Sequence, residues 1–298
     1  MYNGIINIYK EAGFTSHDVV AKLRGILKQK KIGHTGTLDP QATGVLPVCL
    51  GSGTKLCDML TDRDKEYVAE LLLGVCTDTQ DTTGKVLEQR PVDCTEEQVR
   101  EAILGFRGEY DQVPPMYSAL KVDGKKLYEL ARAGKEVERK ARRVQILELE
   151  ILDMNLPVVK IRVLCTKGTY IRTLCADIGE KLGCGGTMRS LLRTKAGSFQ
   201  LEDAVHLSKL EELRDEGRVE EVLIAVDAVF ADCPALHVKD KFVGLLDNGN
   251  AIYSDQTQEG KRYKPGQWVR FYRMDGCFAG VYAWHEEKER YQPVKMFL

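Results

Sequence analysis

Hydrophobic positions recur along the chain with two different periods, and these periods predict both helices and strands. Thr15 and Asp18 form a capping pair, after which hydrophobic residues follow at the spacing of an amphipathic helix. Residues 67–73 alternate between hydrophobic and polar, as a half-buried strand does. Two further alternating runs, at residues 144–154 and 158–165, are separated by a short connection that contains a proline. We therefore expect these two runs to form an antiparallel hairpin.

Capping residues indicate two more helices. Thr95 and Gln98 form a capping box ahead of a helical pattern. Thr169 stands before a stripe of hydrophobic residues within 171–182, and Gly183 follows at the position where glycine commonly ends a helix. The sequence therefore predicts a helix that begins directly after Thr169 and ends before Gly183.

The pattern changes near Cys233, from which short strand-like runs are separated by turn sequences. The runs are 238–246, 268–272 and 278–284, and turns that contain glycine lie between the first two of them. This tail of about 65 residues is predicted to form a small β-barrel, and therefore a second domain.

Residues 33–53 are rich in glycine, threonine and proline, and we expect a loop that is not regular structure throughout. The segment lacks the spacing of a nucleotide phosphate-binding loop and the third glycine of a dinucleotide-binding motif. Within it, Asp39 precedes Pro40, and an aspartate in such a setting most often forms a turn. From these residues alone, a structural role for Asp39 is favoured over a catalytic one.

Composition places the chain among ordinary globular proteins. Of its 298 residues, 43% are hydrophobic and 29% are charged, with 43 basic and 44 acidic side chains. The near-zero net charge hides an uneven distribution. Residues 121–143 hold nine basic and four acidic side chains, residues 160–195 hold eight and two, and residues 200–222 hold three and eight. Two basic segments beside a glycine-rich loop favour a polyanionic partner.

Cysteine and histidine positions argue against disulfides and metals. The nine cysteines include no Cys-x-x-Cys pair, so we expect reduced thiols rather than a disulfide framework. The five histidines do not fall at metal-ligand spacing, and we expect no metal site. No uncharged hydrophobic stretch approaches the length of a membrane span, and the N-terminus lacks the basic start of a signal peptide. These features predict a cytoplasmic protein that does not bind a membrane.

The glycine-rich loop resembles a known signature. The segment 34–47, His-Thr-Gly-Thr-Leu-Asp-Pro-x-Ala-Thr-Gly-Val-Leu-Pro, is similar to the signature loop of the TruB-type tRNA pseudouridine-55 synthases. One departure is Glu11 after Lys10, where family members usually have proline. Further similar motifs follow in the family's order, so that the resemblance covers roughly residues 3–230; they occupy residues 64–67, 77–84, 114–132, 167–173 and 182–185.

The resemblance implies a reaction and roles for particular residues. Asp39 would be the nucleophile in a reaction that breaks the glycosidic bond of a uridine and rejoins the base through carbon. Arg172 would keep this carboxylate ionised, and Tyr67 would stack on the flipped uracil. Asp81 would belong to the polar residues that support the site. No cofactor is implied. The resemblance further implies residues that displace or line the target nucleotide or contact RNA phosphates: His34, Tyr170, Leu191, Lys121, Arg142 and Arg143.

The resemblance also implies the fold and the partner. We expect a mixed α/β fold of the α+β class, the pseudouridine synthase fold, with a largely antiparallel central sheet and flanking helices over residues 1–230. Residues 121–143 would be an insertion that grips RNA, and residues 233–298 a PUA-like RNA-binding barrel. The partner would be the T-arm stem-loop of tRNA, with uridine 55 as the target. We expect a monomer that needs no obligatory protein partner.

Three alternatives stay open at this point. A uracil C5 methyltransferase would use one of the nine cysteines as its nucleophile, although no cofactor-binding loop is found. An RNA-binding or RNA-chaperone protein would share the scaffold without catalysis. A guide-RNA-dependent relative is the third alternative, and the lack of long basic tails in the sequence disfavours it.

Overall fold

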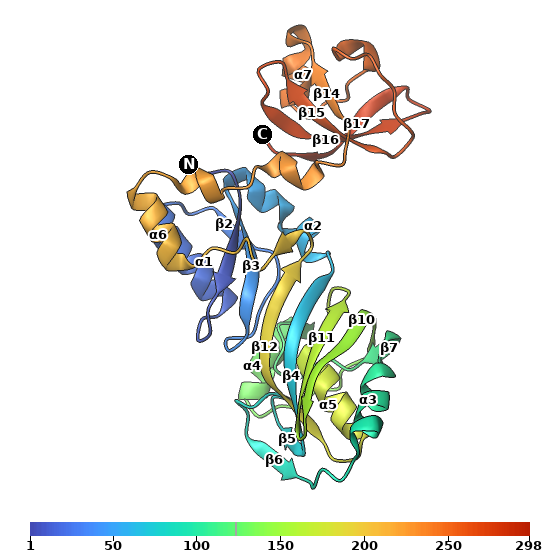
Figure 1. Ribbon diagram of the computed structural model, residues 1–298. Helices are drawn as coiled ribbons and strands as arrows, with labels where there is room; N and C mark the ends of the chain where they lie inside the picture. Colours follow the sequence, from blue (N-terminus) through green and yellow to red (C-terminus); the bar gives the residue numbers. More distant parts are fainter. Residues whose placement is uncertain (123) are drawn as a thin grey trace.

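One large sheet forms the body of the molecule, and a small second sheet forms its C-terminal part (Figure 1). The computed structural model describes residues 1–122 and 124–298, and the side chains of Lys121 and Lys126 lie outside the described part. Within these residues, the main path of the large sheet runs in spatial order through β1 (Gly4–Lys10), β3 (Thr43–Leu50), β12 (Gly186–Ala196), β4 (Lys65–Leu73), β11 (Val158–Cys165), β10 (Arg142–Asn155) and β7 (Gly108–Gln112). Two short strands, β2 (Ile32–His34) and β13 (Phe199–Gln200), pair with β3 and β12.

The large sheet is mostly antiparallel. Of the strand pairs described in it, only β3 and β12 run parallel. The predicted hairpin is present as β10 and β11, and the predicted half-buried strand is β4, whose residues alternate between buried and partly exposed. The expected fold class, a mixed α/β fold with a largely antiparallel sheet, is therefore confirmed.

Helices and short hairpins surround this sheet. The capping boxes predicted at Thr15 and Thr95 are both present, and they begin α1 and α3. The described helices are α1 (Ser16–Leu27), α2 (Cys57–Thr61), α3 (Glu96–Leu104), α4 (Leu127–Arg132), α5 (Ile171–Lys181), α6 (Leu207–Asp215) and α7 (Val243–Asp247). Two separate hairpins pair β5 (Val75–Thr77) with β6 (Val86–Gln89) and β8 (Lys121–Val122) with β9 (Lys125–Lys126).

Segment 33–53 is not regular structure throughout, as expected, although about half of it belongs to strands. The strand β3 occupies residues 43–50, and all but its first residue are buried. Its hydrophobic run continues without alternation because both faces of the strand are covered. The irregular part is therefore limited to residues 35–42, between β2 and β3, and to the 3-10 turn Gly51–Leu56 after β3.

Two helices cover the same face of the large sheet. Arg193 of β12 lies opposite Tyr67 of β4 and also opposite Gly44 of β3, so these positions face the same way. On this face, α1 packs against β3 through Leu46 and its neighbours, whereas α5 packs against β4. Segment 35–42 forms hydrogen bonds with residues of both helices. We call this side of the sheet the helix face.

The second sheet is closed into a small barrel by a connecting segment. Its strands are β14 (Ala235–Val238), β15 (Trp268–Arg273), β16 (Phe278–His285) and β17 (Arg290–Met296). Ile252 exchanges backbone hydrogen bonds with Tyr291 of β17, and Gln258 donates to His237 of β14, so residues 252–258 bridge the two edge strands. The small C-terminal barrel is compatible with the expected PUA-like domain.

The predicted strand-like run 238–246 is wrong beyond its first residue. After Val238 the chain forms a 3-10 turn and then α7. Phe242 and Leu246 pack in the barrel core together with Val238. Their four-residue spacing places them on one side of a helix, which explains why this segment is not a strand.

The barrel packs against the large sheet through a shared hydrophobic cluster. This cluster joins Val45 and Ile5 of the large sheet to Phe230, Val281 and Phe297. Figure 1 shows the barrel at the end of the molecule where the chain terminates, beyond β2 and β3. Among the described residues, no helix is long and hydrophobic enough to span a membrane.

Candidate functional site

A buried lysine holds the backbone on one side of Asp39. Lys10, at the end of β1, has no exposed surface, and its Nζ donates hydrogen bonds to the carbonyls of Pro40 (3.0 Å) and Ala42 (2.5 Å). Burial lowers the pKa of Lys10 to about 8, and the charge of Asp39 opposes this shift. In the sequence, Lys10 attracted notice only because Glu11 follows it. Its place at the end of the hydrophobic run of residues 4–10 was the one sign that it is buried.

Two further contacts shape segment 35–42. The hydroxyl of Ser16, the first residue of α1, accepts the Leu38 N–H at 2.9 Å. Gly44 follows the segment with φ +103°, and a Cβ there would lie 2.2 Å from the carbonyl oxygen of Arg193. A residue with a side chain would therefore both strain the backbone and collide with β12, which explains the glycine at this point of the motif.

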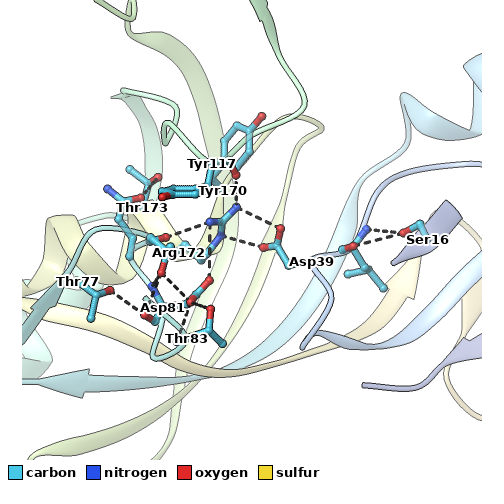
Figure 2. Close-up of polar contacts among 12 residues, drawn as sticks. Ser16, Asp39, Thr77, Asp81, Thr83, Tyr117, Tyr170, Arg172 and Thr173 are labelled. Carbon is cyan, nitrogen blue, oxygen red and sulfur yellow. Dashed lines mark hydrogen bonds and ion pairs between the residues drawn. The ribbon is translucent and has the colours of Figure 1, made fainter. Parts of the chain in front are cut away.

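The carboxylate of Asp39 and the guanidinium of Arg172 form a two-point ion pair (Figure 2). Arg172 Nε lies 2.8 Å from Asp39 Oδ2, and Nη2 lies 3.1 Å from Oδ1. The Arg172 side chain is only 5% exposed, whereas 36% of the Asp39 side chain remains exposed. The pair therefore presents a fixed carboxylate that a ligand can reach.

The same guanidinium ties together three parts of the chain. Nη2 also donates to the carbonyl of Tyr117 at 2.8 Å, and Nη1 donates to the carbonyl of Thr79 at 3.0 Å. Nη1 lies 3.8 Å from Asp81, whose carboxylate accepts hydrogen bonds from the backbone and side chain of Thr83. Figure 2 shows Arg172 between Asp39 and the turn that contains Asp81. Arg172 is thus a buried arginine whose guanidinium is surrounded by polar partners.

Burial and charge act in opposite directions on Asp39. Protein atoms crowd its carboxylate and raise its pKa above the ordinary value, the Arg172 charge lowers it, and the Asp81 charge raises it. The net direction is upward. A reaction that needs ionised Asp39 should therefore fail, on acidification, at a higher pH than a free aspartate would predict.

Tyr67 is paired with a buried arginine that the sequence analysis counted as surface charge. Arg193 is 1% exposed, lies opposite Tyr67 in the β4–β12 ladder, and donates to the carbonyls of Val45 (2.6 Å) and Gly36 (3.3 Å). Burial raises the pKa of the Tyr67 phenol, and Arg193 opposes this rise. The clue in the sequence was that Arg193 shares the inward side of an alternating strand with Leu191.

The start of α5 differs from the prediction. The Thr169 hydroxyl donates to the carbonyl of Thr166 instead of capping, and Tyr170 is the N-terminal cap residue without a side-chain cap bond. The buried Gln112 of β7 satisfies this end of the helix, because it accepts the Tyr170 N–H at 2.8 Å and donates to the Tyr170 carbonyl at 3.0 Å. Gln112 therefore fixes the residue two positions before Arg172. The predicted end of the helix is correct, since Gly183 follows it with φ +75°.

Replacing Gln112 with leucine should slow the reaction that the signature loop implies more than it weakens binding of the RNA that the same resemblance implies. Gln112→Leu removes both bonds to Tyr170, so Arg172 loses its fixed position beside Asp39. We expect the single-turnover rate to fall about 10- to 100-fold, and the acid limb of the pH profile to move to higher pH. Gln145→Leu, at an exposed position on β10, is the control. An unchanged rate and pH profile in Gln112→Leu would contradict this role.

The structure brings most of the predicted site residues to the helix face. Leu191 packs with Tyr67 in the core cluster that also contains Leu38, the neighbour of Asp39. His34, at the end of β2, pairs with Val48 on that face, and its Nδ1 accepts the Gly36 N–H. Burial lowers the pKa of His34, which favours the neutral ring.

Arg142 and Arg143, at the end of the basic insertion 121–143, lie on opposite faces of the sheet. Arg142 pairs with Gln112 in the β7–β10 ladder and lies near enough to Tyr170 that its charge lowers the pKa of that phenol, opposing burial. Arg143 points to the opposite face of the sheet, where Asp111 (2.8 Å) and Glu109 (3.1 Å) bind it. The expected phosphate contact of Arg143 therefore has no support from its position. The side chain of Lys121 lies outside the described residues.

The second basic segment, 160–195, is less available than its composition suggests. Arg172 and Arg193 are buried. Three others are paired with carboxylates: Arg162 with Glu150, Lys167 with Asp62, and Arg189 with Glu70. Within the described part of the chain, no group of three histidine, cysteine or acidic side chains is placed to hold a metal ion.

The chain matches family models of one enzyme class over most of its length. Residues 24–171 match the N-terminal domain of the TruB family pseudouridylate synthases, and residues 172–231 match the C-terminal domain of tRNA pseudouridylate synthase B. The chain belongs to the TruB family. This confirms the family expected from the signature loop, and members of this isomerase family are enzymes.

Curated relatives named tRNA pseudouridine synthase B match the TruB chain almost end to end. The protein of Lachnoclostridium phytofermentans is 52% identical, with 99% of this chain and 100% of the relative covered. The protein of Alkaliphilus oremlandii is 49% identical, with 99% and 97% covered. The sequence similarity therefore extends through the residues of the C-terminal barrel.

Solved structures extend the TruB comparison to larger assemblies. A chain in the crystal structure of a Cbf5-Nop10-Gar1 complex superposes with a TM-score of 0.73 at 27% identity, covering 99% of this chain and 85% of that one. A chain in an H/ACA RNP bound to a substrate RNA containing 2′-deoxyuridine gives 0.72 at 25% identity, with the same coverage. These similarities support the assignment of the fold.

Proposed function

We propose that this TruB-family protein converts uridine to pseudouridine at position 55 in the T arm of tRNA, with Asp39 as the nucleophile. The observation that carries the proposal is the two-point ion pair between partly exposed Asp39 and buried Arg172. The family membership and the names of the relatives support tRNA as the substrate. The C1′–N1 bond breaks and the C1′–C5 bond forms, while C5 loses one proton and N1 gains one, so the nucleotide keeps the same number of each atom.

The site provides the groups that this isomerisation needs. Arg172 lowers the pKa of Asp39 against the effect of burial, which keeps a fraction of the carboxylate ionised and nucleophilic. We propose that Tyr67, held by Arg193, stacks on the flipped uracil near the C5 proton. In the same proposal His34 helps to displace the base, Tyr170 and Leu191 line the nucleotide pocket, and Asp81 orients Arg172.

Contacts to the RNA backbone would offset the few kcal/mol that base flipping requires. In our proposal these contacts come from the insertion 121–143, through Arg142 and Lys121, and from the barrel at 233–298. The protein would act as a monomer in the cytoplasm, without an obligatory protein partner. The activity of the purified chain alone tests whether a protein partner is needed, and its mass in solution tests whether it is a monomer.

Two buried thiols beside the site are poor nucleophiles for the methyltransferase alternative. Burial raises the pKa of Cys165 and of Cys175 to about 12, and a thiolate is the form that attacks carbon. Incubation of purified protein with tRNA followed by mass spectrometry separates the alternatives. We expect pseudouridine without a change in tRNA mass; added methyl mass would indicate the methyltransferase, and binding without product would indicate a non-catalytic protein.

The two neighbouring arginines of β10 should behave differently in RNA binding. Arg142→Gln is expected to weaken tRNA binding and to reduce the log–log salt slope by up to about one unit, as loss of one phosphate contact does. Arg143→Gln should leave the slope unchanged, because Asp111 and Glu109 already hold that guanidinium on the opposite face. Filter binding between 50 and 200 mM salt, a range of about fourfold, measures both. Equal effects of the two variants would contradict this assignment.

A further inference from the structure

Three lysines that follow the end of α1 form an exposed group that the proposed site does not use. Lys28, Lys30 and Lys31 lie between α1 and β2, and all three are exposed. No aspartate or glutamate occurs in residues 19–38. None of the three forms an ion pair within the described residues. We call them the α1–β2 lysine cluster.

Two acidic side chains of the neighbouring helix are engaged elsewhere. The helix α6 packs beside α1, but its Glu212 pairs with Lys209 and its Asp215 pairs with Arg214. Within the turn itself, Arg24 donates to the carbonyl of Lys30 at 3.1 Å and thereby fixes the backbone. The cluster is thus a patch of positive charge on an ordered turn, without an ion pair to any described residue.

The position of the cluster connects it to the proposed site. The first residue of α1 is bonded to Leu38, next to Asp39, and the strand that follows the cluster ends at His34. Both α1 and β2 belong to the helix face, which also carries Asp39 and Tyr67. The strand β2 has three residues and is about 10 Å long, so it separates Lys31 from the ring of His34 by about that length.

We propose that the α1–β2 lysine cluster binds phosphates of the substrate RNA outside the target loop. The inference rests on the proposed function for the identity of the RNA. A polyanion is the partner that complements three lysines without an ion-pair partner among the described residues, and the length of β2 between them and His34 places the contact outside the position of the flipped base. The cluster would add affinity and orientation for folded tRNA without taking part in the chemical step.

The test compares Lys30→Glu, Lys31→Glu and the double variant with the unchanged protein in tRNA binding. We expect the double variant to weaken binding about tenfold or more and to reduce the salt slope by about one to two units. Its single-turnover rate at saturating tRNA should stay within about twofold. A minimal hairpin that carries the T loop on a shortened stem should lose little affinity, because it does not reach the cluster.

Lys160→Glu is the matched control, because it makes the same charge change at an exposed residue on the opposite face of the sheet. Melting temperatures of all variants exclude misfolding as the cause of weaker binding. Unchanged tRNA affinity in the double variant, an equal loss in the control, or an equal loss with the minimal hairpin would each overturn the inference. If the unchanged protein made no pseudouridine, the proposed function would fail, and the binding comparison would still test the cluster.

Discussion

Asp39→Asn should abolish pseudouridine formation while tRNA binding stays within about tenfold, which corresponds to about 1.4 kcal/mol. Asparagine keeps the size of the side chain and can still accept a hydrogen bond from Arg172, so the local structure should persist. It lacks the carboxylate that the proposed reaction needs as a nucleophile. We expect the single-turnover rate to fall at least about 1,000-fold.

Asp62→Asn provides the control for this experiment. Asp62 is exposed and pairs with Lys167, away from Arg172, so the same chemical change there should leave the rate unaltered. Binding and product formation are measured on one tRNA preparation. Retention of more than a tenth of the rate by Asp39→Asn would rule out Asp39 as the nucleophile.

Arg172→Lys should reduce kcat by about 100-fold, which corresponds to about 2.7 kcal/mol in the activation barrier. Lysine keeps the charge, but it cannot bind both oxygens of Asp39 and still donate to the carbonyls of Thr79 and Tyr117. Because Arg172 lowers the pKa of Asp39, weaker pairing should raise that pKa further. Activity requires ionised Asp39 and is lost as pH falls through its pKa, so the acid limb should move to higher pH.

Arg189→Lys is the matched control, since Arg189 is 55% exposed and pairs loosely with Glu70 at 3.8 Å. It should change neither kcat nor the acid limb. If Arg172→Lys retained the acid limb of the unchanged protein, Arg172 would not set the ionisation of Asp39. A fall in kcat without that shift would assign Arg172 to structure alone.

Local patterns predicted several parts of this fold correctly. The capping boxes at Thr15 and Thr95 begin helices as expected, because a cap depends on residues within one turn. The strand 67–73 and the hairpin at 144–165 follow from alternation. The run 238–246 was misread, since its hydrophobic residues fit the helical spacing that places Phe242 and Leu246 in the barrel core.

The prediction of the site residues depended on the resemblance of the signature loop. Contacts between residues that are far apart in the sequence were harder to predict. Asp39 and Arg172 are 133 positions apart in the sequence. They meet because Asp39 lies in the segment directly before β3 of the large sheet and Arg172 lies in α5, which packs on the helix face of that sheet. Nothing in the sequence marked Gln112, whose role appears only when β7 lies beside the start of α5. Basic composition does not show where each charge lies: Arg193 is buried and Arg143 is turned to the opposite face, because the register of a strand decides which side a residue occupies.

Mapping of modified nucleotides on tRNA incubated with the purified protein tests the central claim most directly. The proposed function predicts pseudouridine at position 55 with the unchanged protein, and none with Asp39→Asn under the same conditions. No pseudouridine with the unchanged protein, product only at other positions, or product at position 55 with Asp39→Asn would contradict the account.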